Sequence, residues 1–306
     1  MLDISVIIVS WNVRDYLADC LRSIYAEFGR TNLKGDVWVV DNASTDGTQE
    51  LLRDLFPSTR LLINDNNSGF GAANNQGMQA SISANGSGPK YFLFLNPDTL
   101  VRPGAIRSMV ECMEKKPEAG MVGARLVYGD GRFQHSAFRF PGLGQLLFDL
   151  IPLPARLYDS RLNGRYPRRN YRPNGQPFSI DHPLGATMLV RRDVAEATGG
   201  FDESFHMYCE EIDWCWRIQN AGWAIFTVPK AEVVHFGGES TRQIPSRSLV
   251  DLWSSRAMLY RRHHGRLKLL MARKIVLNSL RRKAKKSNNN ELMQAYLEAA
   301  ESWLVM

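Results

Sequence analysis

Cysteine is scarce and widely spaced in this chain of 306 residues. The four cysteines, Cys20, Cys112, Cys209 and Cys215, include no C-x-x-C pair. Disulfide frameworks and structural zinc sites both need more closely patterned cysteines. The spacing therefore predicts reduced thiols in a cytoplasmic protein.

Long apolar runs are also missing. No window reaches the roughly 18 apolar residues that a membrane-spanning helix needs. The longest candidate, 143–155, is interrupted by Asp149, Pro152 and Pro154. The first residues lead directly into an apolar strand instead of a secretory signal. We therefore expect a chain that works in the cytoplasm.

The glycine-rich phosphate loops of two large enzyme classes are absent. No G-x-G-x-x-G follows the first apolar strand, and no G-x-x-x-x-G-K-S/T occurs anywhere. These absences argue against dinucleotide-binding dehydrogenases and P-loop enzymes.

Acidic residues are missing from one long segment. The net charge is +7, and 256–286 holds twelve Lys and Arg with no Asp or Glu. A smaller cluster has one acid, Asp159, among Arg156, Arg161, Arg165, Arg168, Arg169 and Arg172. A solvated face is the ordinary interpretation of such runs. Two isolated blocks favour an anionic partner instead: membrane lipid, pyrophosphate or nucleic acid.

The most informative stretch present is 91–98, YFLFLNPD. Five consecutive apolar residues predict a strand that is buried on both faces, and Pro97 ends it. Asp98 then lies at the carboxyl end of a parallel strand, where ligands of open α/β sheets bind. This carboxylate could hold a divalent metal, or it could only cap a helix that begins near Pro103.

Strands and helices alternate over the first 115 residues. We predict strands at 4–10, 36–40, 60–64 and 91–95, and helices at 15–28, 48–55, up to 83, and 105–115. This alternation predicts an α/β fold with a mostly parallel sheet and helices on both faces.

The second half of the chain is less regular. We predict a long loop region over 140–178 with a short helix at 143–151. Next come a strand at 187–190, helices at 193–198 and 205–220, and a strand pair, 223–228 and 231–235, around Pro229. Basic helices at 246–270 and 274–282 and a last helix at 288–306 complete the prediction.

Three groups of side chains could carry chemistry. One is Asp41 with the loop 66–74, which could bind a pyrimidine nucleotide or could form ordinary turns. Asp98 and His235 each follow an apolar strand, and together they could hold a divalent ion; alternatively His235 is buried and bonded to backbone. Glu210, Glu211 and Asp213 stand together in a predicted helix. One of them could act as a general base, or all could simply complement the helix dipole.

Eight segments in order resemble the inverting family 2 glycosyltransferases of GT-A fold, most closely the rhamnosyltransferase-like branch. They are SVIIVSWN (5–12), VVDNASTDGT (39–48), NNSGFGAANNQG (66–77), FLFLNPD (92–98), GATMLVRR (185–192), GGFDESF (199–205), YCEEIDWCWR (208–217) and VVHFGGES (233–240).

The resemblance implies a metal-dependent transfer of a sugar from a dTDP- or UDP-linked donor, with L-rhamnose as the leading expectation. Mg²⁺ or Mn²⁺ would be held by Asp98 and His235, and Glu211 would be the base, with Asp213 and Glu210 as alternatives. The implied donor-binding residues are Ser10, Asn12, Asp41, Asn42, Asn67, Gly69, Asn74, Asn96 and Asp98. The implied acceptor-binding residues are Gly185, Ala186 and Trp214.

Two positions depart from the family pattern. Asn96 replaces the first acid of the family's D-x-D motif, which lowers the negative charge of the expected metal site. The base position holds Glu211 where Asp is commoner, which adds one methylene.

The resemblance also divides the chain. It implies a GT-A catalytic domain over 1–245, with a nucleotide-sugar-binding half (1–120) and an acceptor-binding half (121–245). A basic helical extension, 246–306, lies beyond it. The acceptor would be a glycan or a polyprenyl-diphosphate-linked sugar of cell-surface polysaccharide synthesis. Residues 246–286 could hold the protein on the inner face of the membrane, and a homo-oligomer is compatible with the sequence.

Two rival functions fit the composition less well. A nucleotidyltransferase of sugar phosphates would carry a glycine-rich basic loop after the first strand, where Ser10-Trp11-Asn12 stands. A nucleic-acid-binding protein would interleave its cations with aromatic residues, but here the cations lie mostly in the tail and the aromatics in the body. We therefore expect no nucleic-acid partner.

Overall fold

The structure is a computed structural model that describes residues 2–84, 86, 88–151, 154, 157, 160–239 and 241–304. Of the residues singled out above, Pro152, Arg156, Asp159 and Ser240 lie outside this range.

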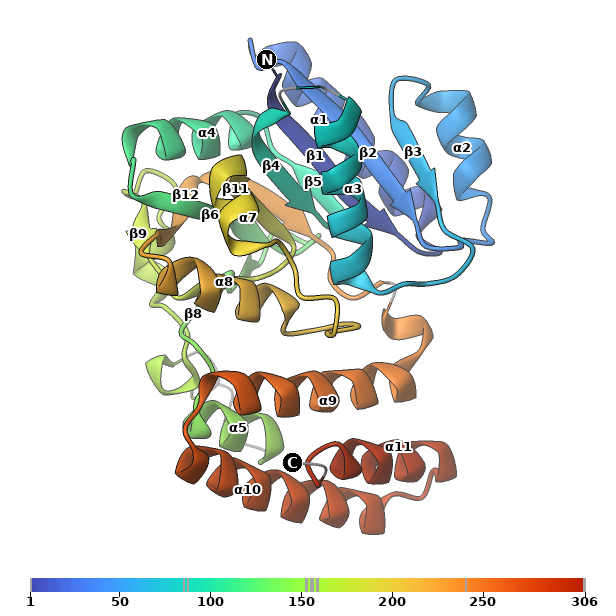
Figure 1. The fold of residues 1–306 in the computed structure, drawn as a ribbon, viewed down its shortest axis with the longest axis vertical. Helices are drawn as coiled ribbons and strands as arrows, with labels where there is room; N and C mark the ends of the chain where they lie inside the picture. The colour runs from blue at the N-terminus through green and yellow to red at the C-terminus, as the bar shows by residue number, and fades with distance from the viewer. Residues whose placement is uncertain are drawn as a thin grey trace.

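A mixed sheet forms the centre of the molecule (Figure 1). Its strands run in the spatial order β3-β2-β1-β4-β11-β6-β12-β5, with β7 beside β6 and β9 beside β12. They are β1 (Leu2–Ser10), β2 (Gly35–Asp41), β3 (Arg60–Ile63), β4 (Pro89–Leu95), β5 (Thr99–Val101), β6 (Ala119–Val127), β7 (Phe133–Gln134), β9 (Phe178–Ser179), β11 (Thr187–Arg191) and β12 (Ala224–His235). A separate ribbon pairs β8 (Ala137–Phe138) with β10 (His182–Pro183).

The first half of the sheet is parallel, as the sequence predicts. Strands β3, β2, β1 and β4 pair in parallel, and β1 and β4 are buried along most of their length. Strand β11 is antiparallel to both of its neighbours, β4 and β6. Its amino end therefore lies at the same edge as the carboxyl end of β4, and both contribute to that edge.

Helices cover both faces of the sheet (Figure 1). One face packs against α1 (Arg14–Arg30), α2 (Thr48–Leu55) and α4 (Ala105–Lys115). The other packs against α3 (Phe70–Ala84), α7 (Arg192–Thr198) and α8 (Glu210–Asn220). Apolar side chains fill both layers, so the open strand ends are left as the place for a ligand site.

Helix α8 begins five residues later than the predicted helix over 205–220, which is a correction. Tyr208 and Cys209 both have left-handed backbone conformations, with φ of 67° and 68°. Such conformations are unfavourable for side chains with a Cβ and interrupt a helix. The consequence is that Glu210 and Glu211 stand in the first turn of α8.

The predicted strand pair around Pro229 is also wrong. The chain forms one strand, β12, which stays paired in parallel with β6 on both sides of an irregularity between Val228 and Glu232. Pro229 lies inside that irregularity. Proline has no N–H for the ladder, so a bulge accommodates it without a turn.

The C-terminal segment forms a helical layer below the sheet (Figure 1). It consists of α9 (Pro245–His263), α10 (Arg266–Lys286) and α11 (Asn290–Glu301), and it packs with α5 (Leu143–Leu150) around a second core that includes Trp253 and Trp303. The predicted basic helices, 246–270 and 274–282, have wrong boundaries, because His264 is extended and α10 starts after Gly265. The predicted last helix, 288–306, is present but shorter, and 305–306 lie outside the described residues. In the described part of the chain, no helix combines the length and apolarity that would let it cross a bilayer.

Candidate active site

A cavity of about 260 Å³ opens where the strands of the parallel half end. Trp11 follows β1, Asn42 follows β2, Asn96 follows β4 and His235 ends β12. The cavity is lined by Val9, Trp11, Asn42, Asn67, Phe70, Asn96, Pro97, Asp98, Leu184, Gly185, Ala186, Met207, Tyr208, Glu210, Glu211, His235, Gly238 and Glu239. Segments far apart in sequence thus meet at one edge of the sheet.

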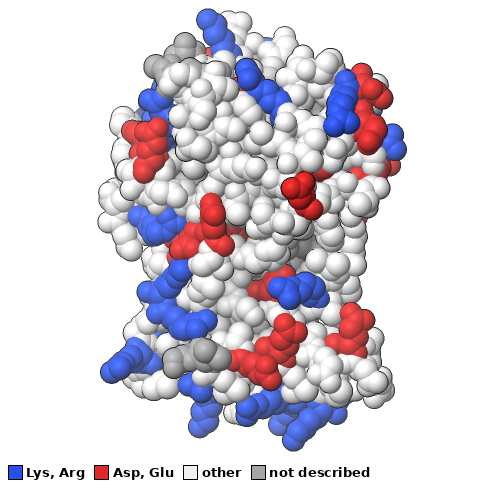
Figure 2. Space-filling view, turned by 45° about the vertical axis from the view of Figure 1, so that its right-hand side comes forward, with Lys and Arg blue, Asp and Glu red and all other residues white. Residues whose placement is uncertain are grey.

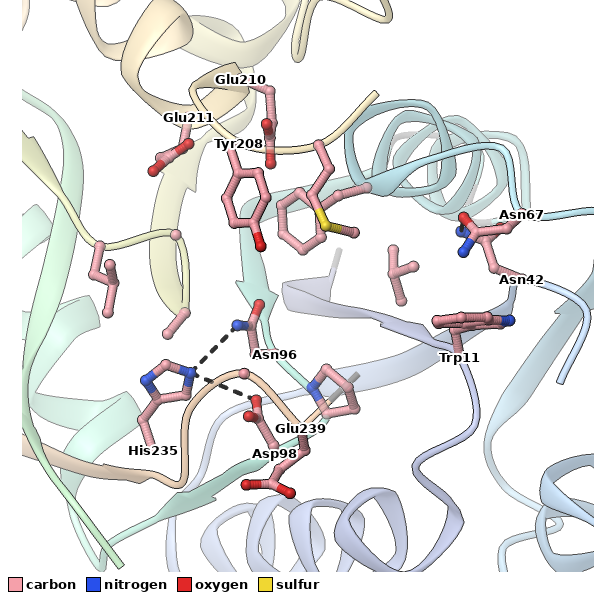
Figure 3. Close-up of a pocket in the computed structure, with 18 residues that line it drawn as sticks. Trp11, Asn42, Asn67, Asn96, Asp98, Tyr208, Glu210, Glu211, His235 and Glu239 are labelled. Carbon is pink, nitrogen blue, oxygen red and sulfur yellow. Dashed lines mark hydrogen bonds and ion pairs between the residues drawn. The ribbon is translucent and has the colours of Figure 1, made fainter. Parts of the chain in front are cut away.

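Asp98 and His235 form one corner of this cavity (Figure 3). The Nε2 atom of His235 lies 3.5 Å from Oδ1 of Asp98 and 3.5 Å from Nδ2 of Asn96. The other oxygen of Asp98 accepts a hydrogen bond of 3.0 Å from the backbone N–H of Gly237. Nδ1 of His235 contacts Oε1 of Gln134 at 3.2 Å. Both side chains are therefore oriented by neighbours from other segments.

This corner fits a divalent cation. A carboxylate oxygen and an imidazole nitrogen converge there, and both side chains are buried. Burial lowers the pKa of His235, with the Asp98 charge acting in the opposite direction, so the neutral imidazole that binds metals is favoured. Within the described residues, no group of three or more His, Cys, Asp or Glu could hold a metal. Further ligand oxygens would therefore have to come from Asn96, water or a bound substrate.

Glu210 and Glu211 lie across the cavity from Asp98 and His235 (Figure 3). Burial raises the pKa of Glu211 to about 7. Burial first, and then the Glu211 charge, raise the pKa of Glu210 well above its ordinary value. Oε2 of Glu210 is buried without a hydrogen-bond partner in the described chain. At neutral pH this pair can therefore offer one protonated carboxyl and one group poised to accept a proton.

Asp213, the third predicted candidate base, does not line the cavity. Its side chain is buried between Arg217, at 2.8 Å, and Nε2 of His263, at 2.8 Å. Although burial alone would raise its pKa, these partners leave it lowered. A carboxylate held in this way has a structural role, and we do not propose it as the base.

Trp214, predicted to contact the acceptor, cannot do so in this structure. It is fully buried against Phe94 and Phe201, and its indole N–H donates to Thr198 at 2.7 Å. This prediction followed from the resemblance alone, and packing against the sheet places the Trp214 side chain in the core. The other two predicted acceptor residues, Gly185 and Ala186, do line the cavity.

Asn42, Asn67, Asn96 and Asp98 line the cavity, whereas the other predicted donor-binding residues do not. Those others are Ser10, Asn12, Asp41, Gly69 and Asn74. Several of them shape the loops instead. Asp41 accepts from the Gln49 side chain at 2.9 Å, Asn12 accepts from the Thr45 N–H at 2.8 Å, and Asn74 donates to the Phe70 carbonyl at 2.9 Å.

Gly69 shows why this loop needs glycine. Its φ is +89°, and a Cβ placed there would lie 2.4 Å from the carbonyl oxygen of His206. The same carbonyl accepts the N–H of Phe70 at 3.0 Å. Gly69 therefore lets the 66–74 loop approach the segment that precedes α8, which brings Asn67 and Tyr208 to the same cavity.

Two residues that line the cavity, Trp11 and Tyr208, were not predicted from the sequence. Trp11 lies beside Asn42 and Asn67 at one end of the cavity, and Tyr208 projects between the glutamates and Asn96 (Figure 3). An aromatic residue directly after the first strand was a signal for Trp11. Tyr208 gave no such signal, because its orientation depends on a left-handed backbone conformation inside a segment with helical spacing.

Comparison with known proteins identifies a family. The model of "Glycosyl transferase family 2" matches residues 5–198. The chain is 32% identical over 220 residues to an N-acetylglucosaminyl-diphospho-decaprenol L-rhamnosyltransferase of Mycobacterium tuberculosis, covering 70% of each chain. It is 25% identical over 164 residues to the rhamnosyltransferase WbbL of Escherichia coli, covering 52% of this chain and 56% of that protein.

Solved structures show the same fold. The mannosyltransferase PcManGT of Pyrobaculum calidifontis, solved in complex with GDP-Man and Mn²⁺, aligns with a TM-score of 0.54 at 14% identity, covering 99% of this chain and 87% of that one. The predicted GT-A fold is thus confirmed, and with it the predicted resemblance to rhamnosyltransferases. This chain belongs to glycosyl transferase family 2 and is a glycosyltransferase.

Proposed function

We propose that this enzyme transfers L-rhamnose from dTDP-rhamnose, with inversion, to a hydroxyl of a lipid-linked or glycan acceptor. One observation carries the proposal: Glu210 and Glu211 face the Asp98–His235 corner across a single cavity. A sugar bound between them has a proton acceptor on one side and a place for its diphosphate on the other. Single-displacement transfer with inversion needs this opposed arrangement.

Glu211 acts as the general base. Its pKa of about 7 lets it accept the proton of the acceptor hydroxyl near neutral pH. The hydroxyl oxygen then forms a bond to the anomeric carbon while the bond from that carbon to the diphosphate oxygen breaks, and both electrons leave with the diphosphate. Glu210, protonated at neutral pH, is placed to donate a hydrogen bond to the bound sugar.

Asp98 and His235 would hold a Mg²⁺ or Mn²⁺ ion, which as a Lewis acid stabilises charge on the departing diphosphate. Asn96 supplies a neutral amide at this corner. A second carboxylate in its place would repel the phosphates of the donor. The Gly237 N–H fixes one Asp98 oxygen and leaves Oδ1 toward His235. The corner is thus oriented before the donor binds.

The nucleoside end of the donor belongs at Trp11, Asn42 and Asn67. Trp11 offers an aromatic surface for a base, and Asn42 Nδ2 donates to Asn67 Oδ1 at 3.2 Å, which orders two amides beside it. Asp41 supports this end from behind through Gln49 and the Ser44 N–H. The rhamnosyl group is our choice because the relatives named above are rhamnosyltransferases.

A panel of nucleotide sugars tests the proposal. dTDP-rhamnose, UDP-sugars and GDP-mannose are each incubated with Mn²⁺, with Mg²⁺ or with chelator, and release of the nucleoside diphosphate is measured with and without a prenyl-diphosphate-linked acceptor. We expect turnover of dTDP-rhamnose that needs the metal and increases with acceptor. No turnover of dTDP-rhamnose under any condition, or turnover only of a UDP-sugar or GDP-mannose, would contradict the proposal.

We also propose that α10 holds the enzyme on an anionic membrane surface. Its outward face carries Leu267, Leu270 and Met271, which are 74%, 58% and 49% exposed. The same face continues, at helical spacing, through exposed cations: Lys274, Arg281, Arg282 and Lys285. Figure 2 shows Lys and Arg gathered at this end of the molecule.

Apolar side chains next to cations favour a membrane interface over water. The leucines can enter the headgroup region, while each nearby Lys or Arg contributes about 1 kcal/mol of attraction to anionic lipid. Such attachment would bring the active site to a lipid-linked acceptor on the inner face of the membrane. It requires no membrane-spanning helix.

A further inference from the structure

Tyr208 combines an unfavourable backbone conformation with a side chain that enters the active-site cavity. Its φ is 67°, and that of the next residue, Cys209, is 68°. Residues with a Cβ rarely take such conformations, and a protein keeps them only where the surrounding structure holds them in place. Backbone strain of this kind gathers at functional sites, so the role of the Tyr208 side chain has to be explained.

Neighbouring segments hold the backbone directly before Tyr208. The carbonyl of Met207 accepts a hydrogen bond of 2.7 Å from the hydroxyl of Ser255 on α9. The carbonyl of His206 accepts the N–H of Phe70 at 3.0 Å. Both partners are distant in sequence, one on each side of the turn. The Tyr208 side chain therefore starts from a backbone that is fixed before any ligand binds.

The two ends of this side chain have different surroundings. Its ring packs against the apolar cluster at the start of α8, and its hydroxyl points into the cavity toward Asn96 (Figure 3). Within the described part of the chain, this hydroxyl has no hydrogen-bond partner. The ring thus holds the residue in place, while the hydroxyl is available to a ligand as a hydrogen-bond donor.

The cavity is short of cationic groups where the diphosphate of a donor would depart. No Lys or Arg stands among the described residues that line it. At the metal corner, one oxygen of Asp98 already accepts the N–H of Gly237, and the imidazole of His235 lies against Asp98 and Asn96. Apart from a bound metal, charge on a departing diphosphate therefore depends on neutral hydrogen-bond donors.

The Tyr208 hydroxyl lies on the side of the cavity where such charge would develop. Glu210 and Glu211 are on one side of it, and Asn96 and the metal corner are on the other (Figure 3). A sugar that receives its new bond from the side of the glutamates loses its old bond on the opposite side. The hydroxyl projects toward that opposite side.

We propose that the Tyr208 hydroxyl donates a hydrogen bond to the oxygen that leaves the anomeric carbon with the diphosphate. This inference rests on the proposed function and adds a catalytic residue to it. As the bond between carbon and oxygen breaks, its electron pair moves onto this oxygen. A fixed donor therefore stabilises the transition state more than the bound substrate. Tyr208 keeps its proton, and the proton of the acceptor hydroxyl goes to Glu211.

Kinetics of the variant Tyr208→Phe test this role, because the substitution removes the hydroxyl and keeps the ring. We expect kcat with dTDP-rhamnose and a prenyl-diphosphate-linked acceptor to fall at least about tenfold, with little change in KM for the donor. The control Tyr128→Phe makes the same change at a tyrosine that is 38% exposed and outside the cavity, and it should behave as the wild type. An unchanged kcat, or a raised KM with unchanged kcat, would overturn the inference.

A binding measurement separates this inference from the identity of the donor. The probe is inorganic pyrophosphate with Mn²⁺, which carries the charge of the leaving group without sugar or nucleoside. In calorimetry we expect Tyr208→Phe to bind it at least about tenfold more weakly than the wild type, because a hydrogen bond to a charged oxygen is lost. Mn²⁺ alone should bind equally well to both proteins.

The outcomes of the two measurements are distinct. Equal affinity of both proteins for pyrophosphate, or no binding by the wild type, would overturn the role of Tyr208. A parallel loss of Mn²⁺ affinity in Tyr208→Phe would overturn it too, because it would show a displaced metal corner. Failure of dTDP-rhamnose as donor would contradict the proposed function and leave the pyrophosphate result to decide the role of Tyr208.

Discussion

At the scale of single residues, Glu211 has the surroundings that a general base needs. It lines the cavity opposite Asp98 and His235, and burial places its pKa at about 7. Asp213 lies two residues further along α8, and its carboxylate is paired with Arg217 and His263. Similar carboxylates in one short stretch thus have different roles because their environments differ.

The pH dependence of turnover follows from this environment. A base acts only when deprotonated, and the pKa of Glu211 is raised, so the active form is lost as the pH falls below about 7. We expect kcat at saturating donor and acceptor to rise with pH up to about 7 and then to level off. An ordinary glutamate would give a profile already flat at pH 6, and that result would contradict a raised pKa for the base.

The metal corner can be strengthened by one substitution. Asn96→Asp adds a carboxylate near Asp98 and His235, and ligand charge increases affinity for a divalent ion. We expect the Mn²⁺ concentration for half-maximal activity to fall in Asn96→Asp and to rise at least about tenfold in Asp98→Asn. Mn²⁺ titrations of activity measure both. The same half-maximal concentration in all three proteins would show that the metal binds elsewhere.

Asp98 and His235 could be predicted from the sequence because each directly follows an apolar strand, and strand ends meet at one edge. Trp214 could not be placed in the same way. Whether a helix residue faces a cavity or the core depends on how the helix is rotated, and this is decided by packing against Phe94 and Phe201.

At the scale of elements, α9 holds α8 in position. Trp216 of α8 is stacked between Phe140, at 3.9 Å, and His263 of α9, at 4.4 Å. The same His263 contacts Asp213 at 2.8 Å. The first turn of α8 carries Glu210 and Glu211, so this contact between helices fixes the position of the proposed base.

Removing the His263 side chain tests this coupling. His263→Ala deletes a stacking partner and a hydrogen bond to a buried carboxylate, which should lower the free energy of unfolding by about 1–3 kcal/mol. We expect kcat to fall while KM for the donor nucleotide changes little, since Trp11, Asn42 and Asn67 are on other segments. Thermal unfolding and steady-state kinetics provide the readouts, with the exposed Arg266→Ala as control. A stability loss without any change in kcat would show that α9 does not position the base.

The residue at which α8 begins could not be predicted from helical spacing in the sequence. Residues 205–220 have helical spacing throughout, but Tyr208 and Cys209 take left-handed conformations. Contacts that are distant in sequence accompany them: the Met207 carbonyl accepts from Ser255 of α9 at 2.7 Å, and the His206 carbonyl accepts from Phe70. Local periodicity carries no information about such partners.

At the scale of the whole molecule, the C-terminal helices are continuous with the catalytic body. Leu259 of α9 is buried together with Phe205, Cys209 and Ile212, which surround the start of α8. A truncation at 246 would expose this cluster as well as remove the basic helices. Tests of membrane attachment should therefore use point substitutions on α10.

Membrane attachment is tested on vesicles. Leu267→Ser, Leu270→Ser, Met271→Ser removes the exposed apolar group, and a second variant replaces Arg281, Arg282 and Lys285 by Gln. We expect both to sediment less with phosphatidylglycerol vesicles than the wild type does, and binding of the wild type to fall at high salt. The control is Leu55→Ser, which changes a leucine that is 59% exposed on α2.

Two results would contradict membrane attachment through α10. One is equal binding to neutral phosphatidylcholine vesicles at low salt, because it would leave the cations without a role. The other is that the variant Leu267→Ser, Leu270→Ser, Met271→Ser loses self-association but binds vesicles as before. That result would show that this face is a contact between copies of the chain. Sedimentation velocity distinguishes the second case.

The parallel first half of the sheet could be predicted from the sequence, whereas the strand order and directions of the second half could not. Each parallel strand of the first half is a continuous apolar run followed by polar residues, which is a local signal. Strand β12 joins two predicted strands because its partner β6 continues past Pro229, and β11 inserts between β4 and β6 in the opposite direction. Both facts depend on pairing across long sequence separations.

The most direct measurement compares Glu211→Gln with Glu210→Gln and Asp213→Asn for kcat and for affinity toward the donor nucleotide. We predict that Glu211→Gln lowers kcat by roughly 10²–10⁴-fold while nucleotide affinity stays as in the wild type, because it removes the base and keeps the shape of the cavity. The other two substitutions should cost less. Wild-type turnover by Glu211→Gln would contradict the assignment of the base and the mechanism built on it.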